Sequence, residues 1–310
     1  MPELRAGGQL CEVAAGSNLL DALRGAGIAI PFSCRAGSCH ACLVRCTRDG
    51  LLDARPEALD AARRAEGWRL ACQCRVQADS TVEVFDPLRD GLPATVAELH
   101  WPAADILRLR VQPQRPLRYS AGQHLVLWHG EVARPYSLAS LPGEPWLEFH
   151  IACQAPGAFC DAARNLRVGD ELRLGELRGG ALHYDPEWQE RPLLLLASGT
   201  GLAPLWGVLR QALQAAHQGP IRLLHLARTP AEHYLAAELA ALSAAHPDLQ
   251  VSLALPADLD AHLAQFRLVS RRSVALLCGQ PASVERFARH LYLAGVPRGQ
   301  TLADLFLSHA

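Results

Sequence analysis

The sequence has no surplus of charge of either sign and no long apolar run. Thirty lysine and arginine residues stand against 31 aspartate and glutamate residues, a formal net charge of −1. This balance argues against a nucleic-acid-binding protein, and no block of like charge indicates a charged tail. Apolar runs such as Leu193–Ala197 are far shorter than the roughly 18 residues of a membrane span. The N-terminus lacks the pattern of a signal peptide, so we expect a cytoplasmic protein without a membrane span.

Cysteine is the residue type in excess. The chain has ten cysteines, and seven of them precede residue 75. Disulfides are rare in a reducing cytosol, so clustered cysteines there indicate metal or redox chemistry. The distribution predicts that this chemistry is confined to the N-terminal quarter.

The pattern of residues 1–88 predicts one small domain. Short strand-like pieces come first, and a helix follows through three leucines, with Ser17 as its N-cap and glycines at its end. Residues 81–85 alternate apolar and polar side chains, which is typical of a strand. Residues 86–93 carry turn signals without periodicity, so we expect a linker.

Two further domains are predicted, as suits a chain of 310 residues. Between residues 94 and 188, short runs with β propensity at 106–111, 124–128 and 146–151 indicate a small antiparallel barrel, with one short helix near 158–166. Strands and helices alternate from residue 190 to 310, which predicts a doubly wound parallel sheet. The expected strands are 193–197, 221–226, 249–255 and 273–278, and the expected helices are 203–216, 231–243 and 282–293.

The cysteine loop has the spacing of an iron–sulfur protein. Cys34, Cys39 and Cys42 follow the C-x4-C-x2-C pattern in which thiolates hold a two-iron cluster. The loop is rich in small residues because its backbone must curl around inorganic sulfides, and Gly37 can take a positive φ there. A fourth ligand must come from further along, at Cys72 or Cys74.

This loop resembles the plant-type [2Fe-2S] ferredoxins. In that family the fourth cysteine follows a gap of about 29 residues, often after Leu-Ala. Residues 43–71 are such a gap, and Leu70-Ala71 precede Cys72. The resemblance therefore implies a β-grasp ferredoxin-like domain with Cys72 as fourth ligand and Cys74 as a packed thiol. The alternative, a zinc site of Cys39, Cys42, Cys72 and Cys74, would leave Cys34 without a role.

The barrel segment contains the string Arg134-Pro135-Tyr136-Ser137. Ahead of a nucleotide-binding pattern, this string resembles the flavin motif of the ferredoxin–NADP reductase superfamily. The resemblance implies that Arg134 pairs with the flavin phosphate, Tyr136 stacks on the ring and Ser137 lies near N5. Arginine forks suit phosphate, and an aromatic face suits a planar heterocycle.

The start of the short helix is a second expected flavin contact. In the same superfamily, main-chain N–H groups at this point bind the flavin pyrophosphate. The corresponding residues here are Gly157, Ala158 and Phe159, and Ala158 stands where a second glycine is common. A plain turn into a helix is the alternative reading.

The nucleotide-binding pattern begins after the apolar run. Gly199, Thr200 and Gly201 lie between a buried strand and a helix, where a glycine turn brings backbone close to a pyrophosphate. Cys278-Gly279 resembles the superfamily's motif beside the nicotinamide. The tail 303–306 resembles the oxygenase-reductase subgroup and implies that Phe306 lies near the flavin. A strand-ending turn with a buried cysteine, and a packed terminal hydrophobe, are the simpler alternatives.

The three resemblances imply an NAD(P)H-dependent oxygenase reductase with an N-terminal plant-type [2Fe-2S] domain. The expected domains are 1–88 for the cluster, 94–188 for the FAD-binding barrel and 190–310 for NAD(P). Electrons would pass from NADH or NADPH through FAD to the cluster, and then to a protein acceptor such as an oxygenase component. Ser137 and Cys278 would serve at the hydride site. Alternatives are a flavin reductase of a small molecule and a redox-sensing iron–sulfur module. We assign no role to the thirteen histidines.

Overall fold

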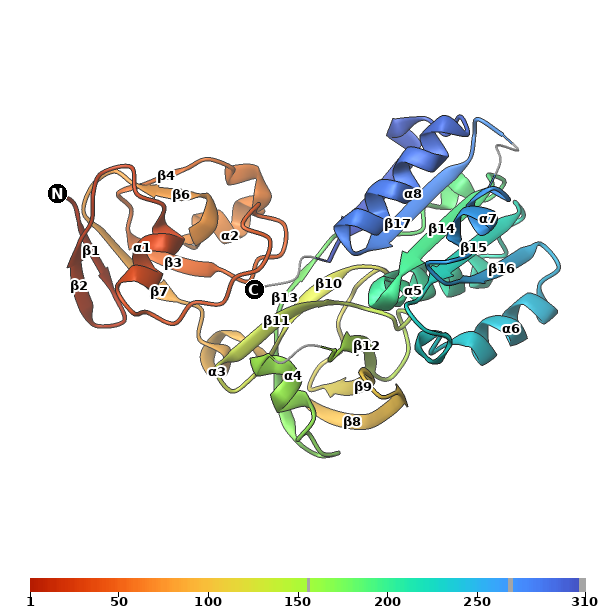
Figure 1. The fold of residues 1–310 in the computed structure, drawn as a ribbon. Coiled ribbons are helices and arrows are strands. Elements are labelled where there is room, and N and C mark those ends of the chain that lie inside the picture. Colours follow the sequence, from red (N-terminus) through yellow and green to blue (C-terminus); the bar gives the residue numbers. More distant parts are fainter. Residues whose placement is uncertain (155–156, 267–269, 307–310) are drawn as a thin grey trace. The chain divides into compact units, whose positions relative to one another are not determined.

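The computed structural model describes residues 1–154, 157–266 and 270–306 (Figure 1). The chain divides into two compact units, which are described separately. The first comprises Met1–Pro93, Leu125–Pro135 and Leu172–Arg178, and the second holds the remaining described residues. Pro156, ahead of the expected flavin helix, and the last four residues of the expected 190–310 domain lie outside the described residues.

A mixed five-stranded sheet with one helix forms the N-terminal fold. Its strand order is β2-β1-β7-β3-β5, and β1 is parallel to β7 while the other neighbours are antiparallel. This is the β-grasp arrangement, and a two-stranded sheet of β4 and β6 accompanies it. The strands are β1 (Glu3–Ala6), β2 (Gln9–Glu12), β3 (Leu43–Arg48), β4 (Leu51–Asp53), β5 (Trp68–Leu70), β6 (Cys74–Val76) and β7 (Ser80–Val84).

Helix α1 (Leu19–Gly25) buries the three leucines that predicted it. Its N-cap is Asn18, so the expectation of Ser17 is wrong by one residue. The Asn18 side-chain oxygen accepts a hydrogen bond from the backbone N–H of Asp21, as an N-cap asparagine does. The helix includes Gly25, and Gly27 with φ 76° follows its end. Asn18 is therefore the N-cap, because its side chain reaches the N–H of Asp21, the third residue of the helix.

The first unit continues into segments far along the sequence. The Phe85 ring stacks on that of Trp128, with centroids 5.5 Å apart, and Val126 and Ala133 join the same buried cluster. The Glu176 carboxylate pairs with Arg178 and with Arg63 of helix α2 (Ala61–Ala65). The core of this unit thus includes side chains from residues beyond 93.

Residues 86–93 are more regular than expected. Helix α3 (Pro87–Asp90) begins there, with Pro87 at its first position, and the Asp86 side chain accepts a hydrogen bond from the N–H of Leu88 at 2.9 Å. An aspartate N-cap followed by proline favours a helical turn, so the segment expected as a linker contains one short helix.

A six-stranded sheet follows, in the order β11-β10-β13-β8-β9-β12, and β9 is antiparallel to both β8 and β12. The expected strands at 106–111, 124–128 and 146–151 are present with shifts of one or two residues. The elements are β8 (Leu92–Ala103), β9 (Ile106–Pro113), β10 (His124–His129), β11 (Val132–Ser137), β12 (Leu147–Ala152), α4 (Ala158–Ala163) and β13 (Glu171–Arg178).

The C-terminal part is a five-stranded parallel sheet in the order β16-β15-β14-β17-β18. Alternate residues of the central strand β14 (Leu193–Ser198) enter two separate cores. Leu195 packs with α5 and α6 side chains, and Leu196 packs with those of α7 and α8. Helices thus cover both faces, as the doubly wound prediction requires (Figure 1). The other strands are β15 (Ile221–Leu226), β16 (Leu249–Ala254), β17 (Val274–Gly279) and β18 (Thr301–Leu305).

The helices of this sheet are α5 (Leu202–Gln214), α6 (Ala236–Ala245), α7 (Leu259–Leu263) and α8 (Pro281–Leu293). Helix α6 begins five residues later than expected, because residues 230–232 form a separate 3-10 turn. Helix α7 and strand β18 were not predicted. The expected fold class, a β-grasp domain, an antiparallel barrel and a doubly wound domain, is confirmed. Within the described ranges, no helix is long and apolar enough to cross a membrane.

Candidate cofactor sites

The cysteine loop is curled by three residues with left-handed backbone. Gly37 has φ 79°, and the non-glycine residues Arg35 and His40 have φ 52° and 55°. The curl directs main-chain N–H groups at sulfur. Cys34 Sγ accepts three of them at 3.3 Å, from Ala36, Ser38 and Cys39. Such donors stabilise a thiolate and would also serve a cluster sulfide.

The four expected ligand cysteines form two pairs. The thiol of Cys39 interacts with Cys34, and this contact lowers the pKa of Cys34 to about 4. The thiol of Cys42 interacts with Cys72 and lowers the pKa of Cys72 to about 7. Thiolates are the metal-binding form of cysteine, so each pair holds a sulfur that ionises readily.

The pairing fits a two-iron cluster better than a single metal ion. In the part of the chain that the structure describes, no group of three or more His, Cys, Asp or Glu side chains could hold one metal ion. The zinc site considered from the sequence does not match the pairing, because Cys34 belongs to a pair and Cys74 belongs to neither. Two thiolates for each of two irons is the ligand count of a [2Fe-2S] cluster, and the two pairs supply it.

Cys72 and Cys74 differ in their surroundings. Cys72 lies in the 3-10 turn Ala71–Gln73, and Cys74 is the first residue of β6, so the two do not share a strand. Gln73 Nε2 lies 3.2 Å from the Cys72 sulfur, and Asn18 Nδ2 donates to the Cys72 carbonyl at 2.9 Å. Cys74 is fully buried, and burial raises the pKa of its thiol. Gln73 and Asn18 are supporting residues that the sequence did not reveal.

The expected flavin residues Arg134, Tyr136 and Ser137 lie in strand β11. Arg134 and Tyr136 are half-buried and two residues apart, so they share a face of the strand, whereas Ser137 is buried. The Tyr136 ring lies 5.0 Å from that of Phe159 in α4. The strand and α4 thus bring together two aromatic rings that could cover a planar heterocycle.

Gly157 and Ala158 stand at the start of α4. The φ of Gly157 is 177°, an extended value, and a Cβ there would meet no atom within 4 Å. Neither backbone conformation nor packing therefore requires glycine at this point. The residue remains a candidate through its main chain alone.

Gly199, Thr200 and Gly201 form a 3-10 turn at the carboxyl end of β14. Two glycines allow this turn to approach the end of β17. A Cβ on Gly201 would collide with the Cys278 carbonyl, and one on Gly279, which has φ 133°, would collide with Ser198. The chain leaves β14 for β15 on one side and returns to β17 on the other, so the turn lies at the topological switch point where α/β sheets bind ligands.

The structure brings Cys278, Gly279 and Phe306 to the same point. The Phe306 N–H donates to the Gly279 carbonyl at 2.8 Å, and the Gln280 N–H donates to Ser198 Oγ at 3.0 Å. Cys278 is fully buried, and burial raises the pKa of its thiol, so it stays protonated. A neutral thiol can pack against a nicotinamide, but it is a poor nucleophile.

A set of buried polar side chains in the second unit was missed by sequence reasoning. Glu148, His150, Tyr234 and His225 follow one another through contacts from the barrel to the glycine turn. They come from three separate segments, since Glu148 and His150 share β12, and their spacing matches no motif. The only signal was their residue type in otherwise apolar elements.

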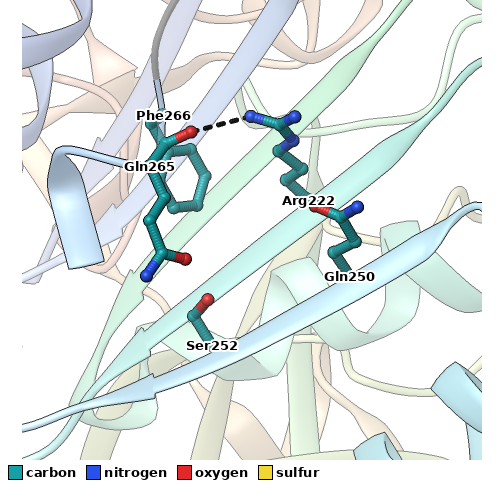
Figure 2. A pocket seen from close by; sticks show the side chains of 5 residues that line it. All are labelled: Arg222, Gln250, Ser252, Gln265 and Phe266. Atoms are coloured by element: carbon teal, nitrogen blue, oxygen red, sulfur yellow. Dashed lines mark hydrogen bonds between the residues drawn. The ribbon is translucent and has the colours of Figure 1, made fainter.

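Figure 2 shows a further pocket. It is lined by Arg222 and Gln250, near the amino ends of β15 and β16, with Ser252, Gln265 and Phe266, and Arg222 donates to the Gln265 carbonyl at 2.8 Å. The glycine turn is at the carboxyl end of the same sheet. This pocket is therefore not the nucleotide site.

Comparison with known proteins agrees with these features. Residues 4–77 match the 2Fe-2S iron–sulfur cluster binding domain, and residues 195–290 match the oxidoreductase NAD-binding domain. The ferredoxin–NAD(P)+ reductase component of the naphthalene 1,2-dioxygenase system of Pseudomonas putida is 31% identical over 94% of both chains. The reductase subunit of an Amycolatopsis aromatic O-demethylase is 33% identical over 90% of both. The crystal structure of an Amycolatopsis cytochrome P450 reductase covers 99% of both chains, with a TM-score of 0.65 and 28% identity.

Proposed function

Because this chain belongs to the NAD(P)H-dependent oxygenase reductases of the ferredoxin–NADP reductase superfamily, we propose that its terminal acceptor is an oxygenase component. The chain is an oxidoreductase that passes electrons from NAD(P)H through FAD to a [2Fe-2S] cluster. The observation that carries the proposal is the pairing of four cysteines in one loop and one turn. It provides a one-electron centre in the same chain as a hydride site, which suits an acceptor that takes electrons singly.

We assign the cluster to Cys34, Cys39, Cys42 and Cys72. The first two form one thiol pair and the last two the other, and main-chain donors surround Cys34. Arginine and aromatic side chains of β11 and α4 are assigned to FAD, with Arg134 on phosphate and Tyr136 on the ring. Bound FAD supplies the conversion of a two-electron hydride donor into single electrons.

At the hydride site, this chain's residues bind and orient. The turn Gly199–Gly201 would receive the nucleotide pyrophosphate, because it leads into the N-terminus of α5, and a helix N-terminus favours anions. Buried Cys278 flanks the nicotinamide as a neutral thiol, and Ser137 and Phe306 complete the flavin side. Proximity and orientation, rather than acid–base catalysis, are their contribution.

NADH is the proposed donor in preference to NADPH. Arg228 follows β15, where an arginine could bind a 2′-phosphate. Its guanidinium instead makes hydrogen bonds of 2.7 and 3.1 Å to Glu232 Oε1, and its backbone N–H donates to Oε2 of the same residue. A 2′-phosphate would have to displace or face this carboxylate. A cytoplasmic location is also proposed, since clustered cysteines point to metal or redox chemistry in a reducing compartment.

Reconstitution tests the acceptor. Purified reductase, loaded with FAD and iron–sulfide, is combined with candidate oxygenase components, and NADH-dependent product formation is measured. We expect coupled turnover with wild type and its loss in Cys72→Ala. Ferricyanide reduction should persist in that variant, because ferricyanide can draw electrons from the flavin. Equal oxygenase turnover by both proteins would contradict the proposed route through the cluster.

A further inference from the structure

The glycine turn at the switch point is held from the sheet side by a buried histidine. His225 in β15 has no solvent-exposed surface, and its Nε2 lies 3.0 Å from the Gly199 carbonyl oxygen. A carbonyl can only accept, so Nε2 carries the hydrogen. The same carbonyl also accepts the N–H of Leu202 at the start of α5. The Gly199 carbonyl oxygen thus accepts two hydrogen bonds, one from His225 and one from Leu202. Gly199 itself has φ 55°.

This hydrogen bond determines where the turn's N–H groups point. The carbonyl and the N–H of one trans peptide point in opposite directions. Directing the Gly199 carbonyl at His225 therefore directs the Thr200 N–H away from the sheet. That is the direction from which an anion can approach the start of α5.

A second histidine selects the tautomer of His225. His233 Nδ1 lies 3.3 Å from His225 Nδ1, so one of the two nitrogens must carry a hydrogen and the other must accept it. Since His225 already carries its hydrogen on Nε2, neutral His225 accepts at Nδ1. His233 is then the donor. The pair therefore keeps the His225 hydrogen on the side that faces Gly199.

A buried chain of contacts holds the ring in place. The Tyr234 ring meets the His225 ring edge-on, with centroids 5.7 Å apart, and the Tyr234 hydroxyl lies 3.0 Å from His150 Nδ1. His150 Nε2 lies 2.9 Å from Glu148 Oε1, and Arg108 and Arg110 also bind Glu148. An ionised carboxylate only accepts, so His150 donates from Nε2 and accepts the tyrosine hydrogen at Nδ1. In this series of contacts, each hydrogen-bond donor therefore has a single acceptor: Tyr234 donates to His150, and His150 donates to Glu148.

We propose that His225 is a positioning residue for the nicotinamide dinucleotide, which acts by orienting the Gly199–Thr200 peptide toward the pyrophosphate. The inference rests on the nucleotide half of the proposed function and is independent of the acceptor. It concerns dinucleotide affinity and not the hydride step itself. His225 contacts the turn, and no step of the electron transfer passes through it.

Three substitutions separate the hydrogen bond from packing. His225→Leu removes both ring nitrogens, and His225→Asn keeps an amide only at the reach of Nδ1. His225→Gln places an N–H donor at about the reach of Nε2. We expect the Kd for ADP-ribose, measured by calorimetry on the FAD-loaded protein, to rise about tenfold in the leucine and asparagine variants. In the glutamine variant it should stay within about threefold of wild type.

A small hydride donor provides the control. 1-Benzyl-1,4-dihydronicotinamide has no pyrophosphate, so its rate of flavin reduction should be equal in wild type and all three variants. The KM for NADH should rise in the leucine and asparagine variants. His217→Leu, which removes a histidine bound to Tyr184 in the same unit, should leave ADP-ribose affinity unchanged. If the leucine variant does not fold, the asparagine and glutamine variants decide. Unchanged ADP-ribose affinity in His225→Asn, equal losses in Asn and Gln variants, or a matching loss with the benzyl donor would overturn the proposal.

Discussion

Two thiols that are two residues apart, Cys72 and Cys74, should respond in opposite ways to substitution. Cys72 belongs to a thiol pair with Cys42, whereas Cys74 is a buried core side chain. We expect Cys72→Ala to lose or severely destabilise the cluster, and Cys74→Ala to keep its visible and electron paramagnetic resonance spectra. Iron and acid-labile sulfide analysis checks both. The assignment is wrong by two residues if Cys74→Ala abolishes the cluster signal and Cys72→Ala retains it.

Glu232 should control the choice between nucleotides. In Glu232→Gln the carboxylate that neutralises Arg228 is gone, and the freed guanidinium can pair with a 2′-phosphate. We expect wild type to prefer NADH, and the kcat/KM for NADPH to rise on the order of tenfold in the variant, since one charge-assisted hydrogen bond is worth about that factor. Steady-state kinetics with ferricyanide and both nucleotides measure it. Arg228→Ala, added to Glu232→Gln, is the control and should abolish the gain in kcat/KM for NADPH.

Among individual residues, the sequence predicts those that belong to a short local motif. The Cys34–Cys42 loop and the Gly199–Gly201 turn are short strings, so their spacing can be read directly. The supporting residues Asn18 and Gln73 touch Cys72 only after folding. His225 lies in a strand whose pattern predicts burial, but its partner carbonyl is 26 residues away.

The N-cap of α1 joins a helix to the proposed distal ligand. Asn18 binds the Asp21 N–H and the Cys72 carbonyl through one side chain. We expect Asn18→Ala to lower the free energy of unfolding of the N-terminal fold by about 1–2 kcal/mol and to accelerate cluster loss in denaturant. Loss of visible absorbance against urea concentration measures this. Ser17→Ala is the matched control and should change the free energy of unfolding and the cluster loss little. An effect equal to that of Asn18→Ala would indicate that Ser17 is the N-cap.

The glycine turn tolerates no side chain at Gly201. A Cβ there would collide with the Cys278 carbonyl, which is backbone and cannot rotate away. We expect Gly201→Ala to displace the turn and to lower kcat/KM for NADH by on the order of 10²-fold, with cluster and flavin content preserved. Gly299→Ala has open space around its Cβ and should behave as wild type. NADH kinetics near wild-type values in Gly201→Ala would show that the turn is not the nucleotide site.

In the C-terminal part, most element boundaries were predictable because buried strands and amphipathic helices carry their own periodicity. Strand β15 was placed without error, and α8 within one residue. The short elements α3, α7 and β18 were not predicted. A helix of four or five residues shows too little of a 3.6-residue period, and β18 gains its stability from pairing with β17 rather than from an apolar run.

Glu176 makes the first unit sensitive to acid. Burial alone would raise the pKa of its carboxyl, but the interactions with His40, Arg178 and Arg63 outweigh burial and hold the pKa at about 2. An unfolded glutamate titrates near 4.3. The stabilisation is therefore fully present above about pH 4.5 and is lost as the pH falls toward 2.

Comparison of wild type with Glu176→Gln tests this. At pH 7 the variant should unfold with about 1–3 kcal/mol less free energy, and the difference should shrink as the pH falls to 3. Denaturant titrations followed by tryptophan fluorescence provide the values. Glu83→Gln, an exposed partner of Arg89, should show little difference at either pH. A Glu176→Gln deficit that is constant with pH would assign the role to packing instead of charge.

The organisation of the whole chain was predictable in its order but not in its contacts. The succession of a cysteine loop, short strands and then alternating strands and helices follows from the sequence. The association of Phe85 with Trp128, and of Arg63 with Glu176, does not, because no local pattern links positions so far apart.

That association limits how reductases of this kind can be recombined. A chimera cut at residue 93 would transplant Phe85 and Arg63 without Trp128 and Glu176, so Phe85 would lose one of its two aromatic neighbours and Arg63 one of its two carboxylate partners. The transplanted piece would keep its cluster loop but lose part of its core. Successful exchange between homologues should therefore depend on whether the recipient already carries an aromatic residue and a carboxylate at these two positions. Natural gene fusions would be expected to inherit the four residues as a set.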